Sequence, residues 1–484
     1  MSDQQVEMWE LSATQLADRI SSGAVSPTEV VDSYLDRIEN ENGELNAYIT
    51  VIEESAHEAA REAETALKNG AEVGPLHGVP IALKDLRAMK QGVRHTFGSR
   101  LFADYEADRT SVMVDRLESA GAIVLGKTNT PEFGHKGLTQ NELVGATASP
   151  VDRSLNAGGS SGGSAAAVGA GLAALATGSD AGGSIRIPAA CCGVFGMKPS
   201  FGLVPIDARP NAFGQQRHHT APGPLSRTVE DAALMLEVMA GPHPADPGSV
   251  PVDIDFRGAV DQSIDGLRIA YSPDLDAFEV DPAVETVVAD ALSGFEAAGA
   301  TVDEVTVDHG LSMGELSEAV GTTFTAAMAE AAAVINEGTG VDLTAHPDDV
   351  SDSLLEMIAK GRECGTDDFA RSGIVRTELF DAIQSTFKSH DLLVTPTLAR
   401  PGFGRHEDLG VDEWNAVLTW PFNVTGHPAA SVPVGCTEAG HPVGLQVVGR
   451  RYADETVLAA SAALEAAGAD HRTGAVRDGS TADE

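Results

Sequence analysis

The sequence predicts an α/β protein in which helices cover a mostly buried sheet. Two short apolar runs, 79–83 and 122–125, fit buried strands and flank a helical stretch at 111–119. The segment 266–308 repeats a strand–helix–strand order. Such alternation is typical of helices layered on a sheet. Because 42% of the 484 residues are hydrophobic, the chain can bury a sizeable core.

The first 70 residues predict helices that pack on this core. Ser12 and Ser26 each precede a Gln or Glu by three residues, which is the arrangement of a capping box, and Pro27 fits the first position of the second helix. An amphipathic pattern over 55–68 predicts a third helix. We therefore expect an N-terminal helical segment, 1–70.

Residues 71–470 are expected to form a single domain. A helical stretch, 312–388, interrupts the strand pattern, which returns at 392–394 and 430–434. No internal repeat divides this region. A polar tail, 471–484, ends the sequence.

The charge of the chain is strongly unbalanced. Lys and Arg number 32 against 72 Asp and Glu, which gives a net charge of −40, and only 8 of the cations are lysine. A dense acidic surface with arginine preferred to lysine is typical of halophilic proteins, because salt screens the self-repulsion. Ordinary acidity is the alternative. Because phosphate binding needs clustered Lys and Arg, the composition argues against direct contact with nucleic acid.

Neither export nor membrane insertion is expected. The first residues lack the cationic and apolar regions of a signal peptide. The longest weakly apolar stretch, 164–177, falls short of the roughly 20 residues that a membrane span needs. We therefore expect a cytoplasmic protein.

The four cysteines show neither CxxC spacing nor a disulfide framework. The adjacent Cys191 and Cys192 could form a redox or metal pair, but buried packing is the favoured interpretation. No cluster of His, Cys, Asp or Glu has the spacing of metal ligands. We expect no metal and no cofactor.

Two serines in glycine-rich turns carry the strongest chemical signal. Ser160 lies in GGSSGGS and Ser184 follows 24 residues later in DAGGS, while Lys84 ends an apolar run far upstream. Glycines beside a serine let backbone N–H groups converge on one point, as an acyl-transfer nucleophile with an oxyanion hole requires. A helix over 163–169 of about 10 Å and a strand over 172–178 of about 20 Å could bring the two turns together.

Three other motif interpretations compete. The stretch 169–174 matches GxGxxG/A but lacks a clean preceding strand, and 121–128 matches a P-loop with apolar residues where phosphate would bind. The run 158–162 matches the GxSxG nucleophile elbow, which needs an acid and then a histidine downstream. The histidines available for that role are His218, His219, His390, His406, His427 and His441.

Several sequence blocks resemble the amidase signature family of serine hydrolases. The main ones are GVPIALKD around Lys84, GGSSGGSAAAV around Ser160, and GSDAGGSIRIPAACCGVFGMKPSFG around Ser184. The resemblance runs from about residue 11 to 465 and includes GKTNTPE, GPLSRT, TPT and PVGLQ in the family's order. One departure is Ser179, where the family usually has threonine; we expect it to leave the catalytic residues untouched.

The resemblance implies an α/β/α sandwich with a central mixed β-sheet and a Ser–Ser–Lys triad. Ser184 corresponds to the nucleophile, Ser160, on a cis peptide bond, to the bridging serine, and Lys84 to the base. An unperturbed lysine titrates near pH 10.4. Burial after an apolar strand must therefore disfavour the ammonium if Lys84 is to take a proton through Ser160.

The family also implies an oxyanion hole beside the nucleophile. Its expected donors are the backbone N–H groups of Ala181, Gly182, Gly183 and Ser184. We interpret Asp180 and Arg186 as a buried pair that orients this turn, with a surface ion pair as the alternative. Ser161 and Ser164 are interpreted as cap or loop hydrogen-bonding residues. The residues interpreted as structural are Lys198, His218 and His219.

The main rival within the family is the glutaminase subunit of the tRNA-dependent amidotransferase, which passes ammonia to a partner subunit. That subunit holds glutamine with an arginine and an aspartate. Here Ala416 stands where the aspartate aligns, shortly before Thr419–Asn423, and 357–366 gives no convincing match for the arginine. Trp420 and Phe422 instead suggest an apolar acyl or amine pocket.

The favoured function is therefore a free-standing amidase acting on a small-molecule amide. The helical stretch 312–388 is expected to build its substrate pocket. Partner subunits are expected only if the amidotransferase alternative holds. A GxSxG esterase and a non-catalytic binding protein are weaker alternatives, and a homodimer is left open as the assembly.

Overall fold

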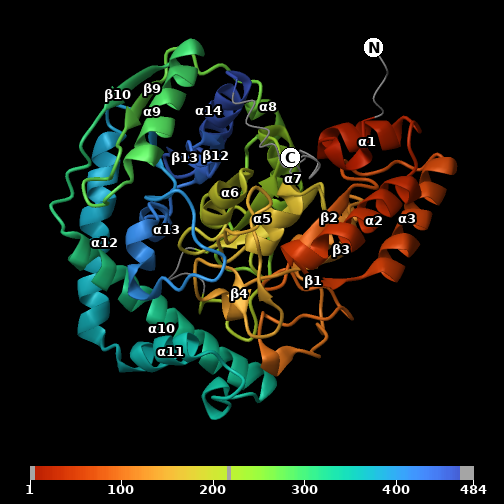
Figure 1. The fold of residues 1–484 in the computed structure, drawn as a ribbon, viewed down its shortest axis with the longest axis horizontal. Coiled ribbons are helices and arrows are strands. Elements are labelled where there is room, and N and C mark those ends of the chain that lie inside the picture. Colours follow the sequence, from red (N-terminus) through yellow and green to blue (C-terminus); the bar gives the residue numbers. More distant parts are fainter. Residues whose placement is uncertain (1–5, 215–219, 469–484) are drawn as a thin grey trace, which may run out of the picture.

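The computed structural model describes residues 6–214 and 220–468 (Figure 1). Its centre is an eleven-stranded mixed sheet with the order β1-β3-β2-β6-β8-β7-β12-β13-β11-β9-β10. The strands are β1 (Tyr48–Val51), β2 (Pro80–Lys84), β3 (Ile123–Thr128), β6 (Leu175–Asp180), β7 (Phe195–Lys198), β8 (Ala221–Ser226), β9 (Arg268–Tyr271), β10 (Thr301–Glu304), β11 (Leu392–Pro396), β12 (Ala429–Cys436) and β13 (Pro442–Gly449). A separate short ribbon pairs β4 (Gln140–Asn141) with β5 (Gly145–Ala146).

Helices cover both faces of this sheet, which confirms the predicted α/β fold with a mixed central sheet. On one face, α5 packs on β2, β6 and β8, and α6 packs on β12 and β13. On the other, α7 packs on β8, and α9 and α14 pack on β12 and β13. The helices are α1 (Ala13–Ser21), α2 (Pro27–Leu45), α3 (Glu53–Lys68), α4 (Val112–Ser119), α5 (Gly162–Gly169), α6 (Arg186–Cys192), α7 (Val229–Met239), α8 (Phe256–Ala259), α9 (Pro282–Ala297), α10 (Met313–Thr339), α11 (Asp352–Glu363), α12 (Thr366–Thr386), α13 (Pro421–Val424) and α14 (Asp454–Ala466).

The N-terminal segment forms the predicted helices and, in addition, an edge strand. Ser12 and Ser26 accept backbone N–H groups in capping boxes at the starts of α1 and α2. Between α2 and α3, β1 pairs antiparallel with β3. Its sequence YITV is rich in β-branched and aromatic residues, which favour a strand, and Tyr48 and Ile49 are buried. The described part of this segment, 6–70, is therefore joined to the sheet as well as packed against it.

The stretch 312–388 is helical, as predicted, and folds into α10, α11 and α12. These helices follow one side of the molecule, away from the N-terminal helices α1, α2 and α3 (Figure 1). Gly361 allows α11 to pack closely on α10, because a Cβ there would lie 2.0 Å from the Thr325 carbonyl oxygen.

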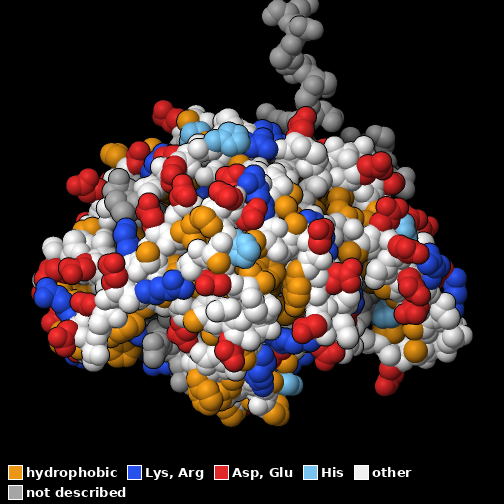
Figure 2. All heavy atoms as spheres, turned by 90° about the horizontal axis from the view of Figure 1, so that it is seen from below, with side chains coloured by type: hydrophobic (Ala, Val, Ile, Leu, Met, Phe, Trp, Pro, Cys, Tyr) orange, Lys and Arg blue, Asp and Glu red, His pale blue; other side chains and the backbone are white. Residues whose placement is uncertain are grey.

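The surface carries the expected acidic character. Figure 2 shows one face of the molecule with Asp and Glu side chains distributed over most of it. In the ranges that the structure describes, no helix is both long and apolar enough to cross a membrane. Cys191 and Cys192 are buried, in agreement with their interpretation as packing residues. The predicted tail 471–484, like His218 and His219, lies outside the described residues.

Candidate active site

The carboxyl ends of β2 and β6 meet at one edge of the sheet and position the predicted site. These strands run parallel and are paired directly. Lys84 is the last residue of β2, and Asp180 is the last residue of β6. The loop after Asp180 leads through Ser184 into α6. The loop before α5 contains Ser160. The predicted helix and strand between the two serines are α5 and β6, each starting and ending within a few residues of the expected positions.

Lys84 is buried and is hydrogen-bonded to Ser160. Its Nζ lies 2.8 Å from Ser160 Oγ, 3.1 Å from Ser179 Oγ and 3.3 Å from the Ser179 carbonyl oxygen. Only 1% of the Lys84 surface is exposed, so these groups form its polar environment. Ser179, the departure from the family's threonine, is therefore a direct neighbour of the Lys84 amine.

The surroundings of Lys84 favour its neutral amine. Burial lowers its pKa well below the value of 10.5 for a free lysine, because the ammonium loses its hydration. The nearby positive charge of Arg87 lowers this pKa further, whereas the negative charge of Asp180 opposes the effect. A lysine in this setting can accept a proton.

Ser160 follows a cis peptide bond from Gly159, as the resemblance implied. The serine is buried, and its carbonyl oxygen accepts a hydrogen bond of 2.9 Å from Thr130 Oγ1. At Gly159 a Cβ would approach the Leu138 backbone to 2.9 Å. Glycine is thus required at position 159 because the Leu138 backbone packs closely against it, and not because a substrate needs the space.

Ser184 lies in the adjoining loop and is partly exposed. Its carbonyl oxygen accepts a hydrogen bond of 3.1 Å from the Ser161 N–H, which fixes the two serine turns side by side. Within the described ranges, the Ser184 hydroxyl makes no hydrogen bond. The structure therefore brings Lys84 and Ser160 into direct contact and places Ser184 in the neighbouring turn, without a side-chain hydrogen bond between the two serines.

The expected oxyanion donors divide into two groups. The N–H of Gly183 donates to Asp180 Oδ1 at 2.7 Å, so in this structure it is already engaged within the loop. Its backbone has φ of +127°, and a Cβ would lie 2.0 Å from Thr419 Oγ1, so only glycine fits. The N–H groups of Ala181, Gly182 and Ser184 have no hydrogen-bond partner among the described residues.

Asp180 and Arg186 form the predicted buried pair. Arg186 Nε and Nη2 each lie 3.0 Å from a carboxylate oxygen of Asp180. Burial alone raises the pKa of Asp180, but the Arg186 guanidinium and the Asn423 amide outweigh it and hold that pKa at about 2. The pair therefore stays ionised and fixes the start of the Ser184 loop.

Three further residues complete this network and were not predicted individually. Arg186 also donates to the Thr419 carbonyl oxygen, Asn423 Oδ1 and Gln446 Oε1. Two of the family-like blocks, Thr419–Asn423 and PVGLQ, contain these residues. The signal was therefore present in the sequence, but their contact depends on distant segments meeting in the fold.

Two aromatic side chains border the Ser184 loop. A Cβ on Gly182 would lie 2.8 Å from Phe324 of α10 and 3.1 Å from Trp414, which belongs to a 3-10 helix, Gly410–Ala416. The two rings are 4.5 Å apart. Both residues are half-buried. They form an apolar wall beside the loop.

The residues predicted for an apolar pocket, Trp420 and Phe422, lie in the core instead. They are 1% and 0% exposed, because both belong to a hydrophobic cluster of buried residues at the start of the short helix Pro421–Val424. Trp420 packs on Phe278 and donates its indole N–H to the Trp414 carbonyl oxygen at 3.1 Å. It therefore supports the wall and does not line it.

The remaining predicted residues have structural contacts. Ser161 precedes α5 but makes no side-chain cap; its hydroxyl contacts the Ser179 backbone. Ser164 donates to the Thr177 carbonyl oxygen at 2.9 Å. Lys198 is buried and donates to the Pro199 carbonyl oxygen at 3.0 Å.

The competing motifs do not form their expected structures. Residues 121–128 run into the buried strand β3, and residues 169–174 cover the end of α5 and a turn. Among the described histidines, none is hydrogen-bonded to Ser160 or Ser184, so no nucleophile elbow with a histidine base is formed there.

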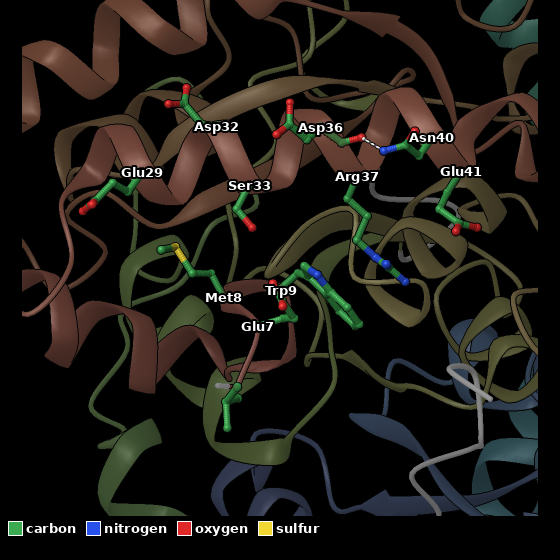
Figure 3. Close-up of a pocket in the computed structure, with 11 residues that line it drawn as sticks. Glu7, Met8, Trp9, Glu29, Asp32, Ser33, Asp36, Arg37, Asn40 and Glu41 are labelled. Carbon is green, nitrogen blue, oxygen red and sulfur yellow. Dashed lines mark hydrogen bonds between the residues drawn. The ribbon is translucent and has the colours of Figure 1, made fainter. Parts of the chain in front are cut away.

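A surface hollow of about 660 Å³ lies apart from this site (Figure 3). It is lined by α2 and the short 3-10 helix Met8–Glu10. Arg37 stacks on Trp9 at 3.6 Å and donates to the Ala170 carbonyl oxygen at the C-terminal end of α5. Ser160 lies at the other end of α5, so this hollow does not serve the Lys84–Ser160 site.

The fold and the lysine–serine site define an amidase signature enzyme, and comparisons place the chain in that family. The profile of the family described as "Amidase" matches residues 29–458, so the chain belongs to it. It is 37% identical to an acylamidase of Rhodococcus erythropolis over 94% of this chain and 95% of that protein. It is 35% identical to a glutamyl-tRNA(Gln) amidotransferase subunit of Moorella thermoacetica over 96% of this chain and 98% of that protein.

A solved structure gives the same result. A bacterial aryl acylamidase of the amidase signature family superposes with a TM-score of 0.90 at 34% identity, covering 95% of this chain and 96% of that one. The protein described here is thus an amidase signature hydrolase with relatives of both the acylamidase and the amidotransferase kind.

Proposed function

We propose that the protein is a free-standing amidase that cleaves a carboxylic amide through an acyl-enzyme on Ser184. The observation that carries the proposal is the buried 2.8 Å hydrogen bond between Lys84 Nζ and Ser160 Oγ, directly beside the Ser184 loop. A buried amine that is hydrogen-bonded to one hydroxyl can take up a proton from a second hydroxyl through the first. Here the second hydroxyl is that of Ser184, which is partly exposed.

In the proposed reaction, neutral Lys84 accepts a proton from Ser160, which takes one from Ser184. The Ser184 oxygen attacks the amide carbonyl, and the C=O bond becomes a C–O⁻ single bond. Ser160 then gives its proton to the amide nitrogen and takes one back from the Lys84 ammonium. The C–O⁻ group becomes C=O again, the C–N bond breaks and the amine leaves. Water attacks the resulting ester and gives a proton to the same relay. The bond between the acyl carbon and the Ser184 oxygen then breaks, Ser184 takes a proton back from the relay, and the carboxylate leaves.

The negative oxygen of the tetrahedral intermediate needs donors that are free in the resting enzyme. The N–H groups of Ala181, Gly182 and Ser184 meet this condition, because Gly183 is already bound to Asp180. Each such donor contributes roughly 3–4 kcal/mol to transition-state stabilisation in other hydrolases. The Asp180–Arg186 pair holds the loop in this orientation.

The half-buried rings of Phe324 and Trp414 support an aromatic or apolar acyl group as the preferred substrate. They abut Gly182, two residues before Ser184 in the loop that carries the nucleophile. The names of two relatives, an acylamidase and an aryl acylamidase, agree with this choice. The helices α10 to α12 thus become the proposed source of substrate selectivity.

The glutaminase subunit of an amidotransferase is the second candidate, since amidotransferase subunits align over nearly the whole chain. Glutamine carries a charged ammonium and carboxylate, and an aspartate for the ammonium is lacking where Ala416 stands. An aromatic wall is a poor substitute, because an unpaired buried charge is costly.

Purified protein assayed without partners separates the two functions. The proposal expects hydrolysis of benzoyl anilides or similar aryl amides by the chain alone. Ammonia release from glutamine, appearing only when amidotransferase partner subunits are added, with no activity on aryl amides, would favour the second candidate.

A further inference from the structure

A buried threonine from a distant part of the sequence is hydrogen-bonded to the loop that carries Ser184. Thr419 Oγ1 donates to the Gly182 carbonyl oxygen at 2.7 Å, and 0% of the Thr419 surface is exposed. Gly182 lies two residues before the proposed nucleophile. The threonine therefore contacts the backbone of the site directly.

The peptide group between Gly182 and Gly183 is held at both of its polar atoms. Its oxygen accepts from Thr419, and its N–H donates to Asp180 Oδ1 at 2.7 Å. Because a peptide group is planar, fixing both polar atoms leaves it little freedom to rotate. Glycines restrict φ and ψ very little, so these two hydrogen bonds determine how the group is oriented.

The two neighbouring peptide groups carry proposed oxyanion donors. The Gly182 N–H belongs to the preceding group and the Ser184 N–H to the following one, and neither has a hydrogen-bond partner among the described residues. Each of these groups shares a Cα atom with the 182–183 peptide group. Rotation of that group would therefore change the direction of both N–H bonds, so their orientation depends on Thr419 as well as on Asp180.

Thr419 and Asp180 are themselves joined through one cation. The Arg186 guanidinium donates to the Thr419 carbonyl oxygen at 2.8 Å and pairs with the Asp180 carboxylate at 3.0 Å. A buried carbonyl oxygen needs only one donor, which any nearby group can supply. Here the donor to the oxygen and the acceptor of the N–H share Arg186, and this arrangement fixes the direction of the peptide group.

We propose that Thr419 is a positioning residue whose hydroxyl orients the Gly182 and Ser184 N–H groups toward the oxygen of the tetrahedral intermediate. The inference rests on the proposed amidase function. In this role Thr419 does not contact the substrate and acts through the 182–183 peptide group. Its contribution should therefore appear in the transition state and not in substrate binding.

Replacing the hydroxyl by a methyl group tests this assignment. Thr419→Val should lower kcat for a benzoyl anilide about 10- to 100-fold, which is less than the loss of a whole oxyanion donor, because the N–H groups are still present but are less well directed. KM should change by less than about 3-fold, since ground-state binding is not affected. Thr419→Ser keeps the hydroxyl and should retain kcat within about 3-fold of the wild type.

Thr425→Val is the matched control. Thr425 is also buried, and its Oγ1 also donates to a backbone carbonyl oxygen at 2.7 Å, but that oxygen belongs to Pro421 of α13. The control makes the same substitution in the same part of the chain without touching the Ser184 loop. Its kcat should equal that of the wild type.

Inhibition by trifluoroacetophenone gives a readout that a purely structural role would not change. Ser184 Oγ adds to the ketone carbon, the Ser184 proton passes to the Lys84 relay, and the C=O oxygen becomes the C–O⁻ of a hemiketal. Thr419→Val should weaken this inhibition by about the factor by which it lowers kcat/KM. Inhibition by the corresponding alcohol, 1-phenyl-2,2,2-trifluoroethanol, should stay unchanged because it forms no oxyanion.

Wild-type kcat and wild-type inhibition by the ketone in Thr419→Val would overturn the assignment and leave the amidase function standing. A rise in KM with unchanged kcat would overturn it as well, because the hydroxyl would then act in substrate binding. A wild-type protein that cleaves no amide and forms no adduct with the ketone would instead overturn the amidase function, and with it this role of Thr419.

A second variant keeps the proposal testable if Thr419→Val fails to fold. Thr419→Cys carries a thiol, which is only a weak hydrogen-bond donor, and should have kcat about 10-fold lower than Thr419→Ser. Equal kcat in the Cys and Ser variants would contradict the assignment.

Discussion

At the scale of single residues, the account depends on Lys84, Ser160 and Ser184 acting together. Lys84→Ala, Ser160→Ala and Ser184→Ala should each lower kcat/KM for an aryl amide by roughly 10⁴-fold or more, since triad members act as a unit. Ser154→Ala, in an exposed loop of the same region, is the control and should retain wild-type kinetics. Substantial turnover by Lys84→Ala would speak against the relay.

The pH dependence of activity should follow the neutral amine of Lys84. Because the unprotonated form is active, kcat/KM rises with pH through the Lys84 pKa, which burial and then Arg87 lower well below 10.5. Arg87→Met removes a neighbouring positive charge, so it should raise that pKa and move the rise to higher pH. A pH profile of a neutral amide for both proteins measures this, and a shift to lower pH would contradict it.

The sequence allowed the residue types of the site to be predicted, because glycine-bracketed serines and a lysine after a strand fit few chemistries besides acyl transfer. It could not show which N–H groups are free. Gly183 turns its N–H to Asp180 because of a backbone conformation that only glycine adopts. Likewise, Trp420 resembled a pocket residue by its type, and only packing against Phe278 places it in the core.

At the scale of elements, the loop between β6 and α6 is held by a buried ion pair. Asp180→Asn leaves the Arg186 guanidinium buried without its counter-charge and should lower the free energy of unfolding by about 3–5 kcal/mol. Denaturant unfolding measures this. The pair's contribution is complete above the usual Asp pKa of 3.8 and is lost as pH falls from there through about 2. An Asp180→Asn protein as stable as the wild type at neutral pH would contradict this role.

Helix α10 should determine acyl selectivity through Phe324. Phe324→Ala removes a ring that contacts the Ser184 loop, so it should reduce kcat/KM for a benzoyl amide about 10-fold or more relative to an acetyl amide. Ile374→Ala, on the exposed face of α12, serves as control because its side chain is 60% exposed. The ratio of the two substrates should stay unchanged in the control. An unchanged ratio in Phe324→Ala would show that the wall formed by Phe324 and Trp414 does not contact the acyl group.

Element prediction succeeded where a pattern was long or apolar and missed β1. Strands β2 and β3 are buried on both faces, so each begins with a continuous apolar run that stands out. The edge strand β1 has four residues and lies between two helices, and its pairing with β3 involves residues far apart in the sequence. Local sequence carries little information about such a contact.

At the scale of the whole molecule, the net charge of −40 should make stability depend on salt. Carboxylates spread over the surface repel one another, and mobile ions screen that repulsion. We propose adaptation to high salt and expect the thermal midpoint of unfolding to rise steadily from dilute buffer to molar KCl. Equal stability in both would indicate ordinary acidity.

The overall architecture was predictable because alternating strands and helices admit few arrangements. The order of the eleven strands was not, since pairs such as β7 with β12 join segments that are far apart in the sequence. That order brings Thr419, Asn423 and Gln446 to Arg186. The site is therefore a product of the complete sheet, although its reactive residues come from three short motifs.

Trapping the acyl-enzyme tests the central claim most directly. The protein is mixed with a slowly hydrolysed benzoyl ester, quenched in acid, digested and analysed by mass spectrometry. The account predicts a benzoyl adduct on the peptide containing Ser184 in the wild-type protein and none in Lys84→Ala. An adduct on another residue, or equal acylation of Ser184 when Lys84 is absent, would contradict it.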